Sequence, residues 1–121
     1  MHPRELKDLI LHRIEKCAQV MNQRQSNYHR NDDTLHNFKR TARMFDEQPE
    51  VSWRGMTGKH LTSLLDAIDD AANGRDIDYQ KLDDVMTDMH NYLYLLEGLF
   101  VERKARIHNH KTMGEFTSEF D

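Results

Sequence analysis

Carboxylates gather in one part of this sequence at spacings that could hold a divalent metal ion. Eight aspartates fall between positions 66 and 88, where only Arg75 and Lys81 carry positive charge. Side chains three and four residues apart lie on one face of a helix, where like charges repel each other by roughly 0.2–0.5 kcal/mol per pair unless a cation compensates. Two such faces turned toward each other would surround a metal ion with oxygen ligands.

Five of these aspartates form two groups with helical spacing. The first group is Asp66, Asp69 and Asp70, and the second is Asp84 and Asp88. Oxygen-only ligands suit Mg²⁺ or Mn²⁺, and Mg²⁺ commonly combines a few carboxylates with the phosphate oxygens of a substrate. The five aspartates are therefore the predicted metal ligands. For the first group taken alone, a solvated surface is the simpler interpretation, because surface helices place their charges opposite the core.

Three further polar residues could hold a phosphorylated nucleotide. Lys59 and Arg24 could neutralise phosphate oxygens, as cations do in phosphoryl transfer. Asn91 follows Asp88 by three residues on the same helical line and could orient a ligand. Each has a structural alternative: Lys59 forms a surface ion pair, Arg24 covers apolar surface with its stem, or Asn91 hydrogen-bonds inside the helical core.

The apolar pattern predicts four helices and no strand to position these residues. The first helix runs from about residue 3 to about residue 27, before a polar turn at 29–33, and the second ends near residue 48. The third ends at Asn73-Gly74, and the fourth reaches about residue 106. We therefore expect an all-α four-helix bundle, with residues 1–106 as a single helical domain and 107–121 as a C-terminal tail.

Local signals predict how the helices begin and which residues they bury. The expected first-turn or capping residues are Pro3, Asp33 or Thr34, Ser52, and Asp76 or Asp78. The expected buried face of the second helix consists of Leu35, Phe38, Ala42 and Phe45. Cys17, the single cysteine, lies in the apolar stripe of the first helix and is expected to be a small core residue. Trp53 is expected to anchor the loop before the third helix, with stacking on a nucleotide base as the alternative.

Composition narrows the class of protein. The 121 residues suggest one domain, and 37% hydrophobic with 31% charged residues is typical of a globular chain. A net charge of −4 argues against direct nucleic-acid binding. No secretory signal and no apolar run near the roughly 18 residues that span a bilayer are visible, so we expect a cytoplasmic protein without a membrane partner.

Three segments also resemble a known family. They are residues 55–66 (GMTGKHLTSLLD), residues 84–93 (DVMTDMHNYL), and an upstream stretch with Arg24, Tyr28, Asp33 and residues 35–38 (LHNF). Together they resemble small phage-encoded helical proteins similar to the MazG-like, all-α nucleoside triphosphate pyrophosphatases and to the phage nucleotide-modification-associated domains. The resemblance implies a four-helix bundle, usually dimeric, in which carboxylates from consecutive helices hold Mg²⁺ against a nucleotide in the host cytoplasm.

The carboxylates depart from the enzyme pattern of that family. The enzymes carry Glu-Glu-x-x-Glu and then Glu-x-x-Asp, whereas Asp66, Asp69 and Asp70 here precede a wider pair, Asp84 and Asp88. Aspartate is one methylene shorter than glutamate, so the helices must lie closer together or hold the ion through water. Two outcomes stay open: Mg²⁺-dependent pyrophosphohydrolysis of a nucleoside triphosphate with Asp66 and Asp88 as catalytic residues, or nucleotide binding at a degenerate site.

The alternative from another class is a non-catalytic phage protein that binds a host protein, such as a defence nuclease. An acidic surface can imitate the phosphates of nucleic acid and occupy a basic groove. The cations discriminate between the two hypotheses, because a phosphate site needs Lys59 and Arg24 whereas an acidic mimic does not.

Overall fold

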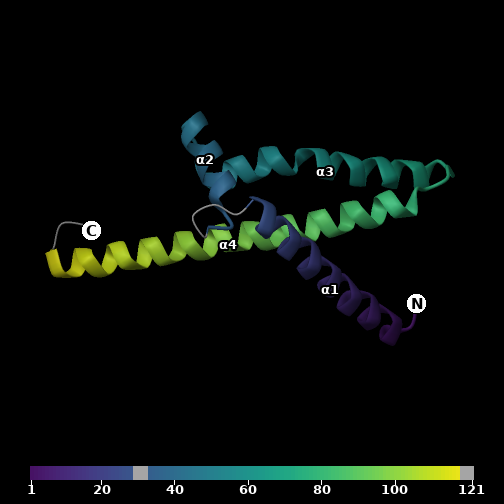
Figure 1. Cartoon of the computed structure of the whole chain (residues 1–121), viewed down its shortest axis with the longest axis horizontal. Helices are drawn as coiled ribbons and strands as arrows, with labels where there is room; N and C mark the ends of the chain where they lie inside the picture. Colours follow the sequence, from purple (N-terminus) through teal and green to yellow (C-terminus); the bar gives the residue numbers. More distant parts are fainter. Residues whose placement is uncertain (29–32, 118–121) are drawn as a thin grey trace.

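The computed structural model describes residues 1–28 and 33–117, and within these ranges the chain forms four α-helices and no strand (Figure 1). The helices are α1 (Pro3–Tyr28), α2 (His36–Phe45), α3 (Pro49–Ala72) and α4 (Tyr79–Thr117). The prediction of an all-α chain with four helices is confirmed for this part of the protein. The polar turn predicted at 29–33 falls, except for its last residue, outside the described residues. No described helix is both long and apolar enough to cross a membrane.

Helix α4 is the element against which the other long helices pack. Figure 1 shows α3 and α4 side by side as an antiparallel pair joined by a short turn, with α1 crossing α4 obliquely. In the described ranges α1 packs against α4 but not against α3. The arrangement is therefore an open, bundle-like one in which α1 and α3 approach α4 separately.

The buried core lies where the start of α2 meets α3 and α4. Its centre consists of Leu35, Phe38 and Leu99. Trp53 packs against this centre and donates a hydrogen bond from Nε1 to the backbone oxygen of Tyr92 at 2.6 Å. The bond ties the first turns of α3 to the middle of α4, so Trp53 anchors α3 itself rather than the loop before it.

Two predicted helix starts are confirmed, and two predicted caps are wrong. The N-cap of α2 is Leu35 rather than Asp33 or Thr34. Helix α1 begins at Pro3, and the Asp78 carboxylate accepts the backbone N–H of Lys81 at 3.1 Å at the start of α4. Helix α3 begins at Pro49, three residues before the predicted Ser52 cap, because proline fits the first turn of a helix, where its missing N–H leaves no bond unmade. Ser52 is instead buried, and its hydroxyl donates to the Glu47 carboxylate at 2.9 Å.

The ends of α2 and α4 also differ from prediction. Helix α2 stops at Phe45 because Asp46 adopts a left-handed conformation with φ 51°, and Phe45 is exposed rather than buried. Leu35, Phe38 and Ala42 are buried as expected. Helix α4 continues past residue 106 to Thr117, so the predicted helix end there is wrong. The division of the chain into a domain and a tail at 107–121 stays a prediction.

Alanine substitutions at two glycines should change the free energy of unfolding in opposite directions, and so test the fold. Gly74, after α3, has φ +65°, so Gly74→Ala should lower the free energy of unfolding by about 1–2 kcal/mol. Gly55 lies inside α3 with no atom within 4 Å of an added Cβ, so Gly55→Ala should raise it by about 0.5–1 kcal/mol. Urea unfolding measures both changes. Equal effects of the two substitutions would contradict the left-handed turn at Gly74.

Candidate functional site

A cavity of about 430 Å³ lies where α1, α2, α3 and α4 approach one another. Helix α1 contributes Arg24, α3 contributes Lys59 and His60, and α4 contributes Asp88, Asn91 and Tyr92. Side chains from the start of α2 line another part of the wall. The cavity collects the three predicted phosphate or nucleotide contacts, Arg24, Lys59 and Asn91, although they are far apart in the sequence.

The cavity changes from polar to apolar along α4. Asp88 is at its polar end and Leu95 at its apolar end, and seven residues of helix separate them by about 10 Å. Because α3 runs antiparallel to α4, Lys59 and His60 lie toward Asp88 while Met56 lies toward Leu95. A ligand with one charged and one apolar end would match this polarity.

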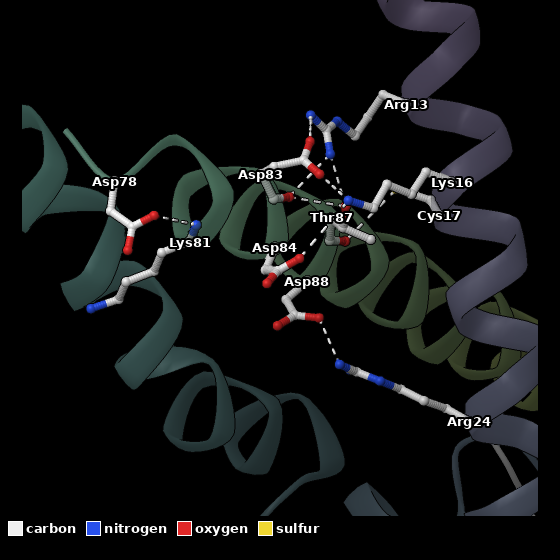
Figure 2. A network of polar contacts seen from close by, with 10 residues as sticks. All are labelled: Arg13, Lys16, Cys17, Arg24, Asp78, Lys81, Asp83, Asp84, Thr87 and Asp88. Carbon is white, nitrogen blue, oxygen red and sulfur yellow. Dashed lines mark hydrogen bonds and ion pairs between the residues drawn. The ribbon is translucent and has the colours of Figure 1, made fainter.

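The Asp88 carboxylate is held by a cation and faces an imidazole. Arg24 Nη2 lies 2.7 Å from Oδ1 of Asp88, a contact that Figure 2 shows between α1 and α4. His60 Nδ1 lies 3.6 Å from the other carboxylate oxygen, and the His60 ring is tilted against Tyr92 at a centroid distance of 5.0 Å. Burial lowers the pKa of His60, and Asp88 opposes this only in part. His60 is therefore a neutral imidazole at neutral pH, able to accept or donate a proton.

The formal charges that line the cavity balance. Arg24 and Lys59 are its cations, and Asp33 and Asp88 are its carboxylates. Asp88 pairs with Arg24, and Asp33 pairs with Lys39 at 2.7 Å, a lysine that also pairs with Glu102 at 2.8 Å. Lys59 forms no ion pair with any residue that the structure describes.

Asn91 is buried at 3% exposure and is only partly hydrogen-bonded. Its Nδ2 donates to the backbone oxygen of Cys17 at 3.1 Å, which links α4 to α1. Its Oδ1 is shielded from solvent and has no hydrogen-bond partner among the described residues. A buried acceptor without a donor costs about 1–3 kcal/mol, so this oxygen weakens the packing of α4 against α1.

The other predicted metal ligands lie outside the cavity. Asp66 and Asp69 are exposed on α3, Asp70 lies 3.3 Å from Arg75, and Asp66 is about 10 Å along α3 from Lys59. Asp84 is mostly exposed, with Lys16 at 3.9 Å. Within the described ranges, no three side chains among His, Cys, Asp and Glu are placed to hold one metal ion together. The assignment of these aspartates to a metal stays a prediction.

Asp83, which the sequence reasoning passed over, has the most contacts of the α4 aspartates. Arg13 Nη2 lies 2.6 Å from Oδ1 of Asp83, and Lys16 is hydrogen-bonded to Oδ2 (Figure 2). Arg13 also donates to the hydroxyl of Thr87 at 2.8 Å. This network joins α1 to α4, so Asp83 holds the helix that carries Arg24. The spacing of basic residues on α1 hints at such pairing, but the sequence does not say which aspartate they meet.

The start of α2 was likewise missing from the predicted site. Thr34, His36 and Asn37 line the cavity, although none of them is among the predicted site residues. The signal available in the sequence was the expected helix start near residue 34. That signal does not indicate which element the helix start faces.

Comparisons of the chain with family models, curated proteins and solved structures found no match. The resemblance to the MazG-like family therefore stays a prediction. Fold and site together define a class: an all-α protein with a partly polar, partly apolar cavity between its helices.

The role of Asp83 can be separated from that of an ordinary surface aspartate. Asp83→Asn removes the charge shared by Arg13 and Lys16 and should lower the free energy of unfolding by about 1–3 kcal/mol. Asp76→Asn is the matched control, because Asp76 is exposed and should change stability by less than about 0.5 kcal/mol. Denaturant unfolding of both variants checks this expectation. Equal stability of the two variants would contradict the structural role of Asp83.

Proposed function

We propose that this protein binds a nucleoside triphosphate or a related phosphorylated nucleotide in the cavity between its helices. The main support is the convergence of Arg24, Lys59 and Asn91 with Asp88 on one cavity. These residues come from three different helices and are the ones that sequence spacing and chemistry marked as nucleotide contacts. A chance surface cluster would not be expected to bring this set together.

The size and lining of the cavity suit a nucleotide. A volume of about 430 Å³ falls within the range of about 300–1,000 Å³ typical of small-molecule sites. The unneutralised Lys59 favours an anionic group. Tyr92, which is partly buried, offers an aromatic ring at the more apolar end, where a base could stack or pack. Burial raises the pKa of Tyr92, so its hydroxyl keeps its proton and can donate a hydrogen bond.

Magnesium would enter this site together with the ligand. Mg²⁺ is often held by one or two carboxylates plus substrate phosphates, so a preformed set of three protein ligands is not required. Asp88, and Asp84 one turn earlier on α4, are the carboxylates suited to that role, and Figure 2 shows both pointing away from Arg13. The ion would neutralise phosphate charge. His60, beside Asp88, is placed to exchange a proton with a bound ligand or water.

We propose hydrolysis of the bound nucleotide as a separate step beyond binding. Release of pyrophosphate from a nucleoside triphosphate would depend on Asp88, which lines the cavity, and on Asp66, which lies about two turns along α3 from Lys59. Binding therefore has more support than turnover. The alternative of an acidic nucleic-acid mimic has less support than nucleotide binding. Asp70, Asp83 and Asp88 are each neutralised by a basic side chain.

Calorimetric titration of a non-hydrolysable nucleoside triphosphate, with and without Mg²⁺, tests the proposal. Lys59→Ala should weaken binding about tenfold by removing the unpaired cation, whereas Lys104→Ala, an exposed control on α4, should leave it unchanged. Asp88→Asn should remove the Mg²⁺ dependence.

Hydrolysis, where it is detected, should be lost in both Asp66→Asn and Asp88→Asn with helical content unchanged. Full activity in both variants would contradict the assignment of Asp66 and Asp88 as catalytic residues. No binding of any nucleotide to the wild-type protein would overturn the proposal and favour the host-protein alternative.

We also infer that two copies of the chain associate through the first half of α1. Leu9, Ile10 and Ile14 are about half exposed and line an open groove of about 490 Å³ beside α4. Leu61 and Leu65 on α3 are similarly exposed. Exposed apolar side chains grouped on one stretch of α1 are a feature of protein–protein contacts in soluble proteins.

Light scattering on the eluting protein measures the association. The wild type should show twice the 14.4 kDa mass of one chain, because burial of the α1 stripe favours pairing. Ile10→Lys should shift the mass to that of one chain, whereas Lys7→Gln, an exposed polar control on α1, should not. A wild type that stays monomeric at high concentration would refute the inference.

A further inference from the structure

Helix α4 carries a second apolar line beside the one that faces the core. The core-facing line includes Tyr92 and Leu99, which are seven residues apart. A step of one residue rotates a helical side chain by about 100°, and the next line along the helix is apolar as well. This outer line of α4, with the same spacing of seven, consists of Tyr79, Met86, Leu93, Phe100 and Ile107. All of its members except Met86 are exposed. A helix with apolar residues on more than one side is typically covered on each of them.

The outer line runs from the groove beside α1 toward the C-terminal end of α4. Tyr79 and Met86 line that groove together with the apolar residues of α1. Leu93, Phe100 and Ile107, each about half exposed, continue the line beyond it. Figure 1 shows the last turns of α4 extending past α2 and α3. The groove and the exposed part of the outer line therefore lie along one side of α4.

The chain exposes more surface than a compact monomer of its mass. Its accessible surface is 9400 Å², whereas the usual scaling of surface with mass gives about 6,800 Å² for a folded monomer of 14.4 kDa. The difference, roughly 2,600 Å², exceeds the roughly 800 Å² that each partner buries in a standard protein–protein interface. The exposed surface is therefore large enough for a stable pair of chains.

Charges along the outer line favour an antiparallel partner. Glu97 precedes Phe100 by three residues and Lys104 follows it by four, so both lie on the same side of the helix, where both are exposed. In a parallel pair of α4 helices, like charges would meet at both positions. An antiparallel pair centred on Phe100 instead places each Glu97 beside the partner's Lys104. Leu93 and Ile107 each lie seven residues, about 10 Å, from Phe100, so the same arrangement brings them together.

We propose that the groove beside α1 is filled by the C-terminal half of α4 from a second copy of the chain, in an antiparallel α4–α4 pair centred on Phe100. The partner's Ile107 then lies beside Leu93 and Tyr94, at the end of the groove that Tyr94 lines. This inference rests on the association of two copies proposed above and deepens it, because it names what fills the groove and in which direction. The same surface pairs with itself, so the contact closes as a dimer.

Phe100→Lys tests the centre of the pair. It places two lysines side by side in an apolar contact and should shift the mass measured by light scattering from that of two chains to that of one. Met44→Lys is the matched control, because Met44 is an exposed apolar residue on α2, away from the outer line. This variant should stay dimeric. Circular dichroism and the unfolding midpoint should show both variants folded, since both positions are exposed.

Charge exchange tests the direction of the pair. Glu97→Lys should raise the dimer dissociation constant about tenfold at low salt, because lysines then face each other at two places. The double variant Glu97→Lys, Lys104→Glu restores opposite charges across an antiparallel pair and should return the constant to within about twofold of the wild type. In a parallel pair, like charges meet in all three proteins, so neither the loss nor the rescue would occur. Sedimentation equilibrium measures the three constants.

The outcomes separate this inference from the association itself. If Ile10→Lys dissociates the dimer but Phe100→Lys does not, two copies associate through α1 and α4 does not fill the groove. If Phe100→Lys dissociates the dimer but the double charge variant is no tighter than Glu97→Lys, the antiparallel direction is wrong. If the wild type is monomeric, both proposals fail together. Nucleotide binding is tested separately, since neither Phe100 nor Lys104 lines the nucleotide cavity.

Discussion

The packing of α1 and α3 on α4, without a contact between α1 and α3 in the described ranges, is the constraint on which the rest of the structure depends. Helix α4 carries the groups that meet each neighbour. The Thr87 and Asn91 side chains bond to α1, and the backbone oxygen of Tyr92 accepts a hydrogen bond from Trp53 of α3. Because α1 and α3 do not pack against each other, the side chains that they direct toward each other are not buried in a helix–helix contact. The cavity lies along this open seam, with Arg24 on one side and Lys59 on the other.

Charge is distributed in two distinct ways along the seam. Away from the cavity, acids and bases neutralise each other, as Asp83 does with Arg13 and Lys16. At the cavity, Lys59 has no ion-pair partner among the described residues, and Oδ1 of Asn91 has no hydrogen-bond partner there. Natural proteins pair most buried polar groups, so the unpaired Oδ1 of the buried Asn91 is an exception among the side chains that the structure describes.

The helices themselves could largely be predicted from sequence, since apolar spacing, Pro3, Asp78 and the Asn73-Gly74 step are local signals that act through the backbone. Pro49 misled the prediction because the same residue can follow one helix and begin the next. Within the candidate site, Arg24, Lys59, Asn91 and Asp88 were identified from residue type and helical phase. The contribution of α2 to the cavity was not predicted, because the residues at a helix start do not indicate which element packs opposite them.

The sequence by itself determined an all-α chain with two long helices rich in aspartate and a few cations suited to phosphate, because periodicity and residue chemistry are local properties. Only the tertiary structure decided which of those charges meet. Asp83, Asp84 and Asp88 look alike in the sequence, yet α1 neutralises Asp83, solvent surrounds Asp84, and Arg24 and His60 surround Asp88. A difference of one residue rotates a helical side chain by about 100°, so the fate of each carboxylate depends on the placement of the neighbouring helices.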